Sequence, residues 1–170
     1  SIESRLMEFQ KMGLTEIIVI PFFPQYASAT TGSVYAEVMR VLSTWQVMPA
    51  VKFVNQFLSH PKFLAGFVQN AQKYLKAHQY DHFIFSYHGL PERQIRKGDC
   101  TKEVCKLGSC CDTLHPMNQH CYRAQCFETT RLLVKTLDIP EGKYTTCFQS
   151  RLGKDPWIQP YTEEVVKELP

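Results

Sequence analysis

No stretch of this sequence is apolar for long enough to span a membrane. The longest apolar run, Ile17 to Phe23, is interrupted by Pro21, whereas a spanning helix needs about 20 apolar residues. The first residues also lack the basic start and the apolar core of a secretion signal. Because no amphipathic or lipidated anchor is visible either, we expect a cytoplasmic protein.

The sequence also lacks a strong excess of charge of either sign. Its 19 Lys and Arg residues against 16 Asp and Glu give a formal net charge of +3, which is too small to indicate nucleic acid as a partner. The 170 residues, 44% of them hydrophobic, suffice for one sizeable core or two small ones. No initiator methionine is present and both ends fall within expected helices, so we expect a piece of a longer protein.

The spacing of apolar residues predicts helices and strands in alternation. Helices are expected at 1–13, about 33–45, 60–76, 122–137 and from 162 onward, and strands at 16–23, 50–53, 83–85 and 143–149. Ser33 or Thr31 is expected to cap the second helix, and Thr162 the last. The alternation predicts an α/β fold with doubly wound parallel sheets. Four strands do not complete a six-stranded sheet, so we expect two incomplete halves joined near Gln46 to Pro49.

The stretch Phe83 to Pro91 places a titratable group at the end of a strand. A compact apolar run at 83–85 is followed by His88 and then Gly89. Ligands of open α/β sheets bind at the carboxyl ends of strands, and a histidine can accept a proton or bind a metal there. We expect Tyr87 to face the core and Gly89 to leave room for a flat ligand. The alternative is a histidine that only ends the strand.

Other polar and aromatic residues are expected at the same edge of a parallel sheet. They follow the first strand, at Tyr26 to Thr31, and the last strand, at Gln149 and Ser150. Trp157 lies in a loop stiffened by two prolines. A tryptophan held in this way is either a stacking surface for a planar ligand or a core anchor of the loop.

Six of the seven cysteines lie between Cys100 and Cys126, in the pattern C-x4-C-x4-C-C-x9-C-x4-C. Without a secretion signal, such clustering indicates an iron–sulfur or zinc site rather than disulfides. The spacing is neither that of paired zinc knuckles nor that of the ferredoxins. The candidate ligands are Cys100, Cys105, Cys110 and Cys111, with Cys121 as the substitute if the adjacent pair cannot both ligate.

Two histidines and two further cysteines lie outside this candidate set. His115 and His120 could join the ligands of a zinc site. Cys126 falls on an expected helix and Cys147 inside an expected strand. We expect both of these to be small apolar core residues.

Five stretches, taken in order, resemble the ferrochelatase family. They are Pro24-Gln25-Tyr26-Ala27-Ser28-Ala29-Thr30-Thr31-Gly32, Ser86-Tyr87-His88-Gly89-Leu90-Pro91, Gly98-Asp99, Phe148-Gln149-Ser150-Arg151 and Asp155-Pro156-Trp157-Ile158-Gln159-Pro160-Tyr161-Thr162. Each alone is weak, but the set is specific and spans nearly the whole chain. The family inserts ferrous iron into protoporphyrin IX, the last step of the usual haem pathway. The resemblance implies two Rossmann-like halves, with residues 1–46 ending the first and 47–170 forming most of the second.

The resemblance also implies roles for individual residues. His88 matches the active-site histidine, assigned to metal binding or to removal of a pyrrole proton. The residues implied to contact the porphyrin are Tyr26, Thr31, Gly32, Gln149, Ser150 and Trp157. Some members of the family associate peripherally with membranes, and the resemblance leaves that contact open here.

The sequence departs from the family pattern in two places. The family's catalytic glutamate falls beyond the last expected helix, so we expect this segment not to chelate iron by itself. Residues 100–120 are an insert, and a [2Fe-2S] cluster, which some members carry, would have to use it, because Ser28 stands where the animal enzymes have one ligand. The alternative functions are a cobalt chelatase of a related tetrapyrrole pathway and a non-catalytic iron–sulfur or zinc module.

Overall fold

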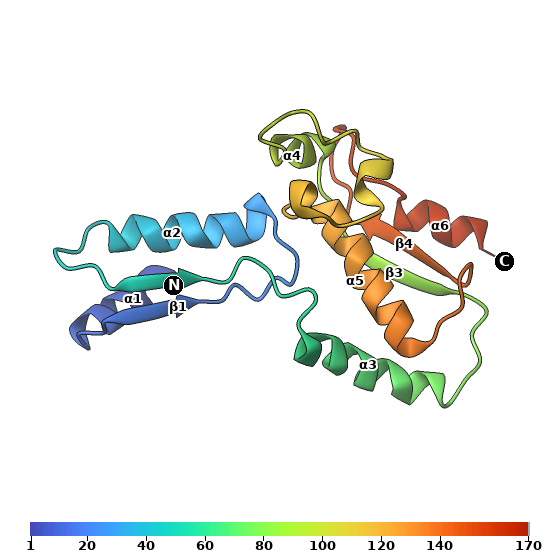
Figure 1. Ribbon diagram of the computed structural model, residues 1–170, viewed down its shortest axis with the longest axis horizontal. Helices are drawn as coiled ribbons and strands as arrows, with labels where there is room; N and C mark the ends of the chain where they lie inside the picture. The colour runs from blue at the N-terminus through green and yellow to red at the C-terminus, as the bar shows by residue number, and fades with distance from the viewer. Residues whose placement is uncertain (170) are drawn as a thin grey trace. The chain divides into compact units, whose positions relative to one another are not determined.

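The computed structural model describes residues 1–169, which form α-helices and parallel strands in two compact units. The first unit, Ser1–Phe57, contains α1 (Ile2–Lys11), β1 (Glu16–Val19), α2 (Ser33–Leu42) and β2 (Ala50–Phe53). The second, from Leu58 onward, contains α3 (Pro61–Leu75), β3 (Phe83–His88), α4 (Glu92–Lys97), α5 (Tyr122–Leu137), β4 (Tyr144–Gln149) and α6 (Thr162–Glu168) (Figure 1). The predicted α/β fold with parallel strands is confirmed.

The first unit is a two-stranded parallel sheet with one packed face. Ile17 of β1 pairs with Val51 of β2 and packs with residues of α1 and α2. Ile18, which alternates to the other face, is 56% exposed. β1 is shorter than expected, because Pro21 has no backbone N–H to continue the ladder. The expected boundary at 46/47 concerns the halves of a longer protein and stays a prediction; in this structure β2 pairs with β1.

The start of α2 differs from the sequence prediction. A π-helical turn, Ser28–Gly32, runs directly into α2, whose N-cap position is Gly32 without a side-chain cap. The prediction of a Ser33 or Thr31 cap is therefore wrong. The chain is already helical before Ser33, whose hydroxyl instead donates to the carbonyl oxygens of Ala29 and Thr30 at 3.1 and 2.8 Å.

The second unit carries helices on both faces of its sheet. β3 and β4 pair in parallel from Phe83 beside Tyr144 to His88 beside Gln149. On one face the Tyr87 and Thr130 hydroxyls, from β3 and α5, are 3.0 Å apart. On the other face, the Thr162 hydroxyl at the start of α6 lies 2.8 Å from that of Ser86. Alternate residues of β3 thus contact different helices, as expected for a doubly wound sheet.

Two local predictions in this unit are corrected. Thr162 does not cap α6; the N-cap position is Tyr161, and the Thr162 hydroxyl donates to Cys147 Sγ at 3.2 Å instead. α4 was not expected from the sequence, and β3 extends past 85 because its pairing with β4 continues to His88.

The core of the second unit lies between the sheet, α5 and the loop before α6. Phe148, Cys126, Ile158 and Ile95 form one buried cluster. Cys126 and Cys147 both have no exposed surface, which confirms them as core residues. None of the helices within residues 1–169 is both long and apolar enough to cross a membrane.

Candidate functional site

His88 and Gln149 end the two neighbouring strands of the second unit. They are paired residues at the carboxyl edge of the sheet, and both are exposed. Trp157 comes from the loop before α6, and its ring lies edge-on to the His88 ring, with 6.4 Å between ring centroids and 62° between planes. Three separate stretches of sequence therefore meet at one edge. We call His88, Gln149, Ser150 and Trp157 the strand-end site.

Gly89 allows the parts of the strand-end site to lie close together. Its N–H donates to the Gln149 carbonyl oxygen at 2.8 Å. A Cβ at this position would lie 2.9 Å from the same oxygen and 3.1 Å from Cε3 of Trp157. The expectation that Gly89 leaves room for a ligand is therefore wrong. The space beside Gly89 is filled by the Gln149 backbone and the Trp157 ring.

The loop that carries Trp157 is fixed to the end of β3. The Ile158 N–H donates to the Leu90 carbonyl at 3.0 Å, and the Glu92 N–H donates to that of Pro156 at 2.9 Å. The Trp157 indole N–H donates to the Leu152 carbonyl at 3.0 Å. Trp157 is thus anchored through its loop and its indole nitrogen, while part of its ring remains exposed beside His88.

Ser150 holds a backbone conformation that is uncommon for a residue with a side chain. Its φ is 68°, in the left-handed region. Such conformations cost free energy and are concentrated at functional sites. The next residue, Arg151, pairs with Glu163 at 3.0 Å and stacks over the Tyr161 ring at 4.4 Å. Ser150 is exposed between the end of β4 and this anchored arginine.

Tyr122 contacts the strand-end site and was missed by the sequence analysis. Its hydroxyl donates to the His88 carbonyl oxygen at 2.8 Å. The two residues lie 34 positions apart, and no local sequence pattern predicts such a contact. Burial raises the pKa of Tyr122 well above its usual range.

The other predicted porphyrin contacts lie in the first unit, along one short segment. Thr31 is fully buried, and its hydroxyl has no hydrogen-bond partner among the described residues. Gly32 lies close to Tyr26, because a Cβ at Gly32 would be 3.4 Å from the Tyr26 hydroxyl oxygen. The π-helical turn brings these three residues together, and their contact with a porphyrin stays a prediction.

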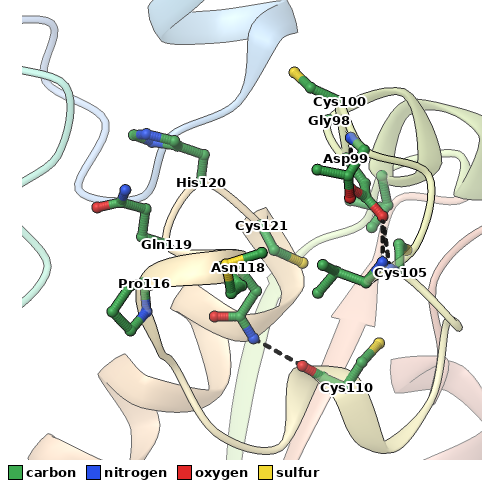
Figure 2. Close-up of a pocket in the computed structure, with 14 residues that line it drawn as sticks. Gly98, Asp99, Cys100, Cys105, Cys110, Pro116, Asn118, Gln119, His120 and Cys121 are labelled. Atoms are coloured by element: carbon green, nitrogen blue, oxygen red, sulfur yellow. Dashed lines mark hydrogen bonds between the residues drawn. The ribbon is translucent and has the colours of Figure 1, made fainter.

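The cysteine segment, residues 100–121, surrounds a cavity of about 200 Å³. Figure 2 shows residues that line it, four of which are Cys100, Cys105, Cys110 and Cys121. Cys111 is buried, with its Sγ 3.6 Å from that of Cys110 and 3.9 Å from that of Cys121. Cys100 is exposed, and its sulfur points away from the other labelled cysteines (Figure 2).

Two polar side chains hold the backbone of the cysteine segment. The Asp99 carboxylate accepts backbone N–H groups from Thr101, Lys102, Val104 and Cys105, the last at 2.7 Å. These bonds, the Cys105 N–H first, lower the pKa of Asp99 to about 2. The buried Asn118 donates to the carbonyl oxygens of Cys110 and Thr113 at 2.7 and 2.8 Å.

The contact between Cys111 and Cys121 shifts the pKa values of the two thiols in opposite directions. The bond from the Cys111 thiol is the first cause that lowers the pKa of Cys121, and backbone N–H groups at the start of α5 add to it. The same bond and burial raise the pKa of Cys111. Cys121 is therefore the better candidate for the thiolate of this pair.

The segment supplies soft donors but not a closed metal site. Tetrahedral zinc with Zn–S bonds of about 2.3 Å places its sulfurs about 3.8 Å apart, close to the two observed sulfur distances. Within residues 1–169, however, no three Cys, His, Asp or Glu side chains are grouped so as to hold a metal. His115 serves as a cap, because its Nδ1 accepts the Met117 N–H at 3.2 Å. The donors fit a thiolate-bound metal only if the segment closes around it.

Together, the two parallel sheets and the strand-end site define an α/β protein with polar and aromatic side chains gathered at the carboxyl edge of its strands, where open α/β sheets bind ligands. The family model described as Ferrochelatase matches residues 1–170. A ferrochelatase of Legionella pneumophila (strain Corby) is 41% identical over 153 residues, which are 90% of this chain and 45% of the relative. One from Coxiella burnetii is 39% identical over 169 residues, 99% of this chain and 47% of the relative. The chain belongs to the ferrochelatase family, and it spans a little under half the length of these relatives.

Proposed function

We propose that the complete protein inserts ferrous iron into protoporphyrin IX. The observation that carries the proposal is the strand-end site, where an exposed histidine, a glutamine and a partly exposed tryptophan meet at the carboxyl edge of a sheet. The family membership supports the same reaction. It favours this function over the cobalt chelatase and over the non-catalytic iron–sulfur or zinc module.

In this proposal His88 acts on the pyrrole nitrogens or on the incoming iron. Two pyrrole N–H protons leave, Fe²⁺ takes their place between the four nitrogens, and no electron is transferred. His88 either accepts a proton or holds the iron briefly before it enters the ring. Metal insertion thus needs a base and a bent macrocycle, but no redox partner.

The remaining strand-end residues are proposed to bind the porphyrin. Trp157 offers a ring surface for stacking, and Gln149 and Ser150 offer polar groups beside it. Tyr26, Thr31 and Gly32 are proposed to contact the macrocycle from their own segment. Contacts along the rim supply the free energy that bends the ring toward the geometry of the transition state.

The test uses the complete protein under anaerobic conditions. Protoporphyrin IX and Fe²⁺ are added, and the porphyrin visible bands are followed. We expect the four free-base bands to collapse to two, and we expect His88→Ala to slow this change at least about 100-fold. His78→Ala, which removes an exposed histidine before β3, is the matched control. Normal chelation by His88→Ala would remove His88 from the mechanism, and an inactive wild-type protein would overturn the function.

We also propose that the cysteine segment holds a [2Fe-2S] cluster, with zinc as the alternative metal. The ligands we favour are Cys105, Cys110, Cys111 and Cys121. The close contacts of Cys111 with both Cys110 and Cys121 support Cys121 over the exposed Cys100 as the fourth ligand. Bound metal would tie the ends of the segment together, and we assign it no step of the reaction.

Two further expectations belong to the same proposal. None of the seven cysteines forms a disulfide in the described residues; we propose that the complete protein works in the cytoplasm, where thiols stay reduced and available to a metal. We also expect residues 1–170 alone to be inactive, because the family's catalytic glutamate has no counterpart among them.

A further inference from the structure

The first turn of α5 is joined to the backbone of His88 by a side-chain hydrogen bond. Tyr122 is the first residue of α5, and its hydroxyl donates to the His88 carbonyl oxygen at 2.8 Å. The N–H of Gly89, the residue directly after β3, donates to the Gln149 carbonyl at 2.8 Å. The residue that carries the imidazole is therefore held from two directions, by β4 through its neighbour and by α5 through Tyr122.

The surroundings of Tyr122 keep this hydrogen bond in place. The ring packs against the buried cluster that contains Cys126, Ile95 and Phe148. The hydroxyl oxygen lies 2.8 Å from the His88 carbonyl oxygen, which can only accept, so the tyrosine is the donor. A ring that is packed against a core can hold the atom it bonds in a fixed position better than a flexible exposed side chain can.

The two residues beside Tyr122 contact the other functional segments. Cys121, the N-cap of α5, has its Sγ 3.9 Å from that of Cys111. Arg123 donates to the Gly108 carbonyl at 3.3 Å and to the Gln159 carbonyl, in the Trp157 loop, at 3.2 Å. One helical turn therefore touches the cysteine segment, the end of β3 and the loop that carries Trp157.

We infer that Tyr122 is a positioning residue that aims the His88 imidazole. The inference rests on the role proposed above for His88. Without the hydroxyl, the His88 carbonyl loses this donor, and the end of β3 is free to shift. Displacements of about 1 Å in a well-ordered site cost roughly 100-fold in rate. For the smaller shift expected in Tyr122→Phe, we predict a fall in kcat of about 10-fold, with the KM for porphyrin changed less than about twofold.

Tyr87→Phe is the matched control for Tyr122→Phe. It also removes one tyrosine hydroxyl from the same unit, but the partner of that hydroxyl is Thr130 on α5, not His88. Both variants are made in the complete protein, and the kcat and KM of each are measured. The protein is also labelled with ¹³C-histidine, and the NMR signal of the His88 ring is identified by its loss in His88→Ala.

We expect the His88 ring signal to move in Tyr122→Phe and to stay in place in Tyr87→Phe, with the fall in kcat confined to Tyr122→Phe. An unmoved signal with normal kcat in Tyr122→Phe would overturn the inference. Equal changes in both variants would also overturn it, because they would reflect core packing in general. If the wild-type protein does not chelate iron, the proposed function fails, and the NMR comparison still decides whether Tyr122 positions His88.

Discussion

The strand-end site and the cysteine segment lie in the same unit but are held in place by different kinds of hydrogen bond. Around His88, the fixing contacts are mainly between backbones: Gly89 to Gln149, Ile158 to Leu90 and Glu92 to Pro156. In the cysteine segment they come mainly from the side chains of Asp99 and Asn118, around two short 3₁₀ turns. Backbone pairing in a packed sheet opens only with much of the fold, whereas a capped loop opens locally.

As a result, the side chains of the strand-end site are already in place, whereas those of the cysteine segment are not yet grouped around a common point. At the strand ends the side chains already meet, because the register of β3 and β4 places His88 beside Gln149. In the cysteine segment the sulfur of Cys111 lies close to two others, but within the described residues no three metal-binding side chains are grouped so as to hold a metal. If the cysteine segment binds the metal proposed for it, binding would complete the site, and the binding free energy would contribute to folding. We therefore expect the two regions to respond in opposite ways to backbone changes and to metal removal.

The largest effect is expected when a methyl group is placed between the strand ends. In Gly89→Ala, the new Cβ would lie 2.9 Å from the Gln149 carbonyl oxygen and 3.1 Å from Trp157. Neither neighbour is free to move, since one is backbone and the other is anchored. We expect a loss of about 1–3 kcal/mol in stability and a fall in kcat of about 100-fold, measured by denaturant unfolding and by chelation.

Gly66→Ala is the control for this substitution. Gly66 lies within α3, and a Cβ there would meet no atom within 4 Å. Alanine is favoured over glycine in helices by about 1 kcal/mol, so this variant should be slightly more stable and fully active. A Gly89→Ala protein with wild-type stability and activity would show that the strand ends are not tightly set.

A smaller effect, confined to the other region, is expected when one cysteine is replaced. Cys121→Ser removes the sulfur that lies 3.9 Å from Cys111, whereas Cys100→Ser removes an exposed one. We expect the purified complete protein to lose its iron and acid-labile sulfide, or its zinc, in Cys121→Ser and to keep them in Cys100→Ser. Metal content by elemental analysis and the visible spectrum provide the measurement.

The outcome decides whether the two regions depend on each other. Loss of metal with folded strands, seen as an unchanged His88 ring signal, would show that the two regions are separable. The opposite pattern, with metal lost from Cys100→Ser and kept in Cys121→Ser, would contradict our choice of ligands. Equal retention in both variants would exclude a four-cysteine site that uses either residue.

The regular elements were predictable because their signals are local. Helix 122–137 has its expected bounds, and β4 begins one residue later than expected. α4 gave no such signal, because it is only six residues long and follows a proline turn. The π-helical turn before α2 was also missed, because a run of small residues with hydroxyl groups is equally compatible with a loop that ends in a helix cap.

The residues of the strand-end site could be predicted from the sequence, but the residues that hold them in place could not. His88, Gln149 and Trp157 could be found because strand ends and a stiffened aromatic loop are visible along the chain. Tyr122 could not be found, since its hydrogen bond to His88 spans 34 positions and depends on how α5 packs. The role of Gly89 was misjudged for the same reason: the sequence does not reveal that the neighbouring backbone and Trp157 fill the space beside it.

The smallest effect is expected from the carboxylate that caps the cysteine segment, and it should depend on pH. Hydrogen bonds lower the pKa of Asp99 from 3.8 to about 2, so the charged form stabilises the folded segment. That contribution is fully present above about pH 4 and is lost as the pH falls through about 2. Asp99→Asn should therefore lower the Tm of the complete protein slightly at pH 7, and this difference from wild type should shrink between pH 4 and 2. Asp112→Asn, at an exposed position of the same segment, is the control and should leave the Tm unchanged. If the Tm difference between Asp99→Asn and wild type stays constant down to pH 2, the charge of Asp99 does not hold the segment.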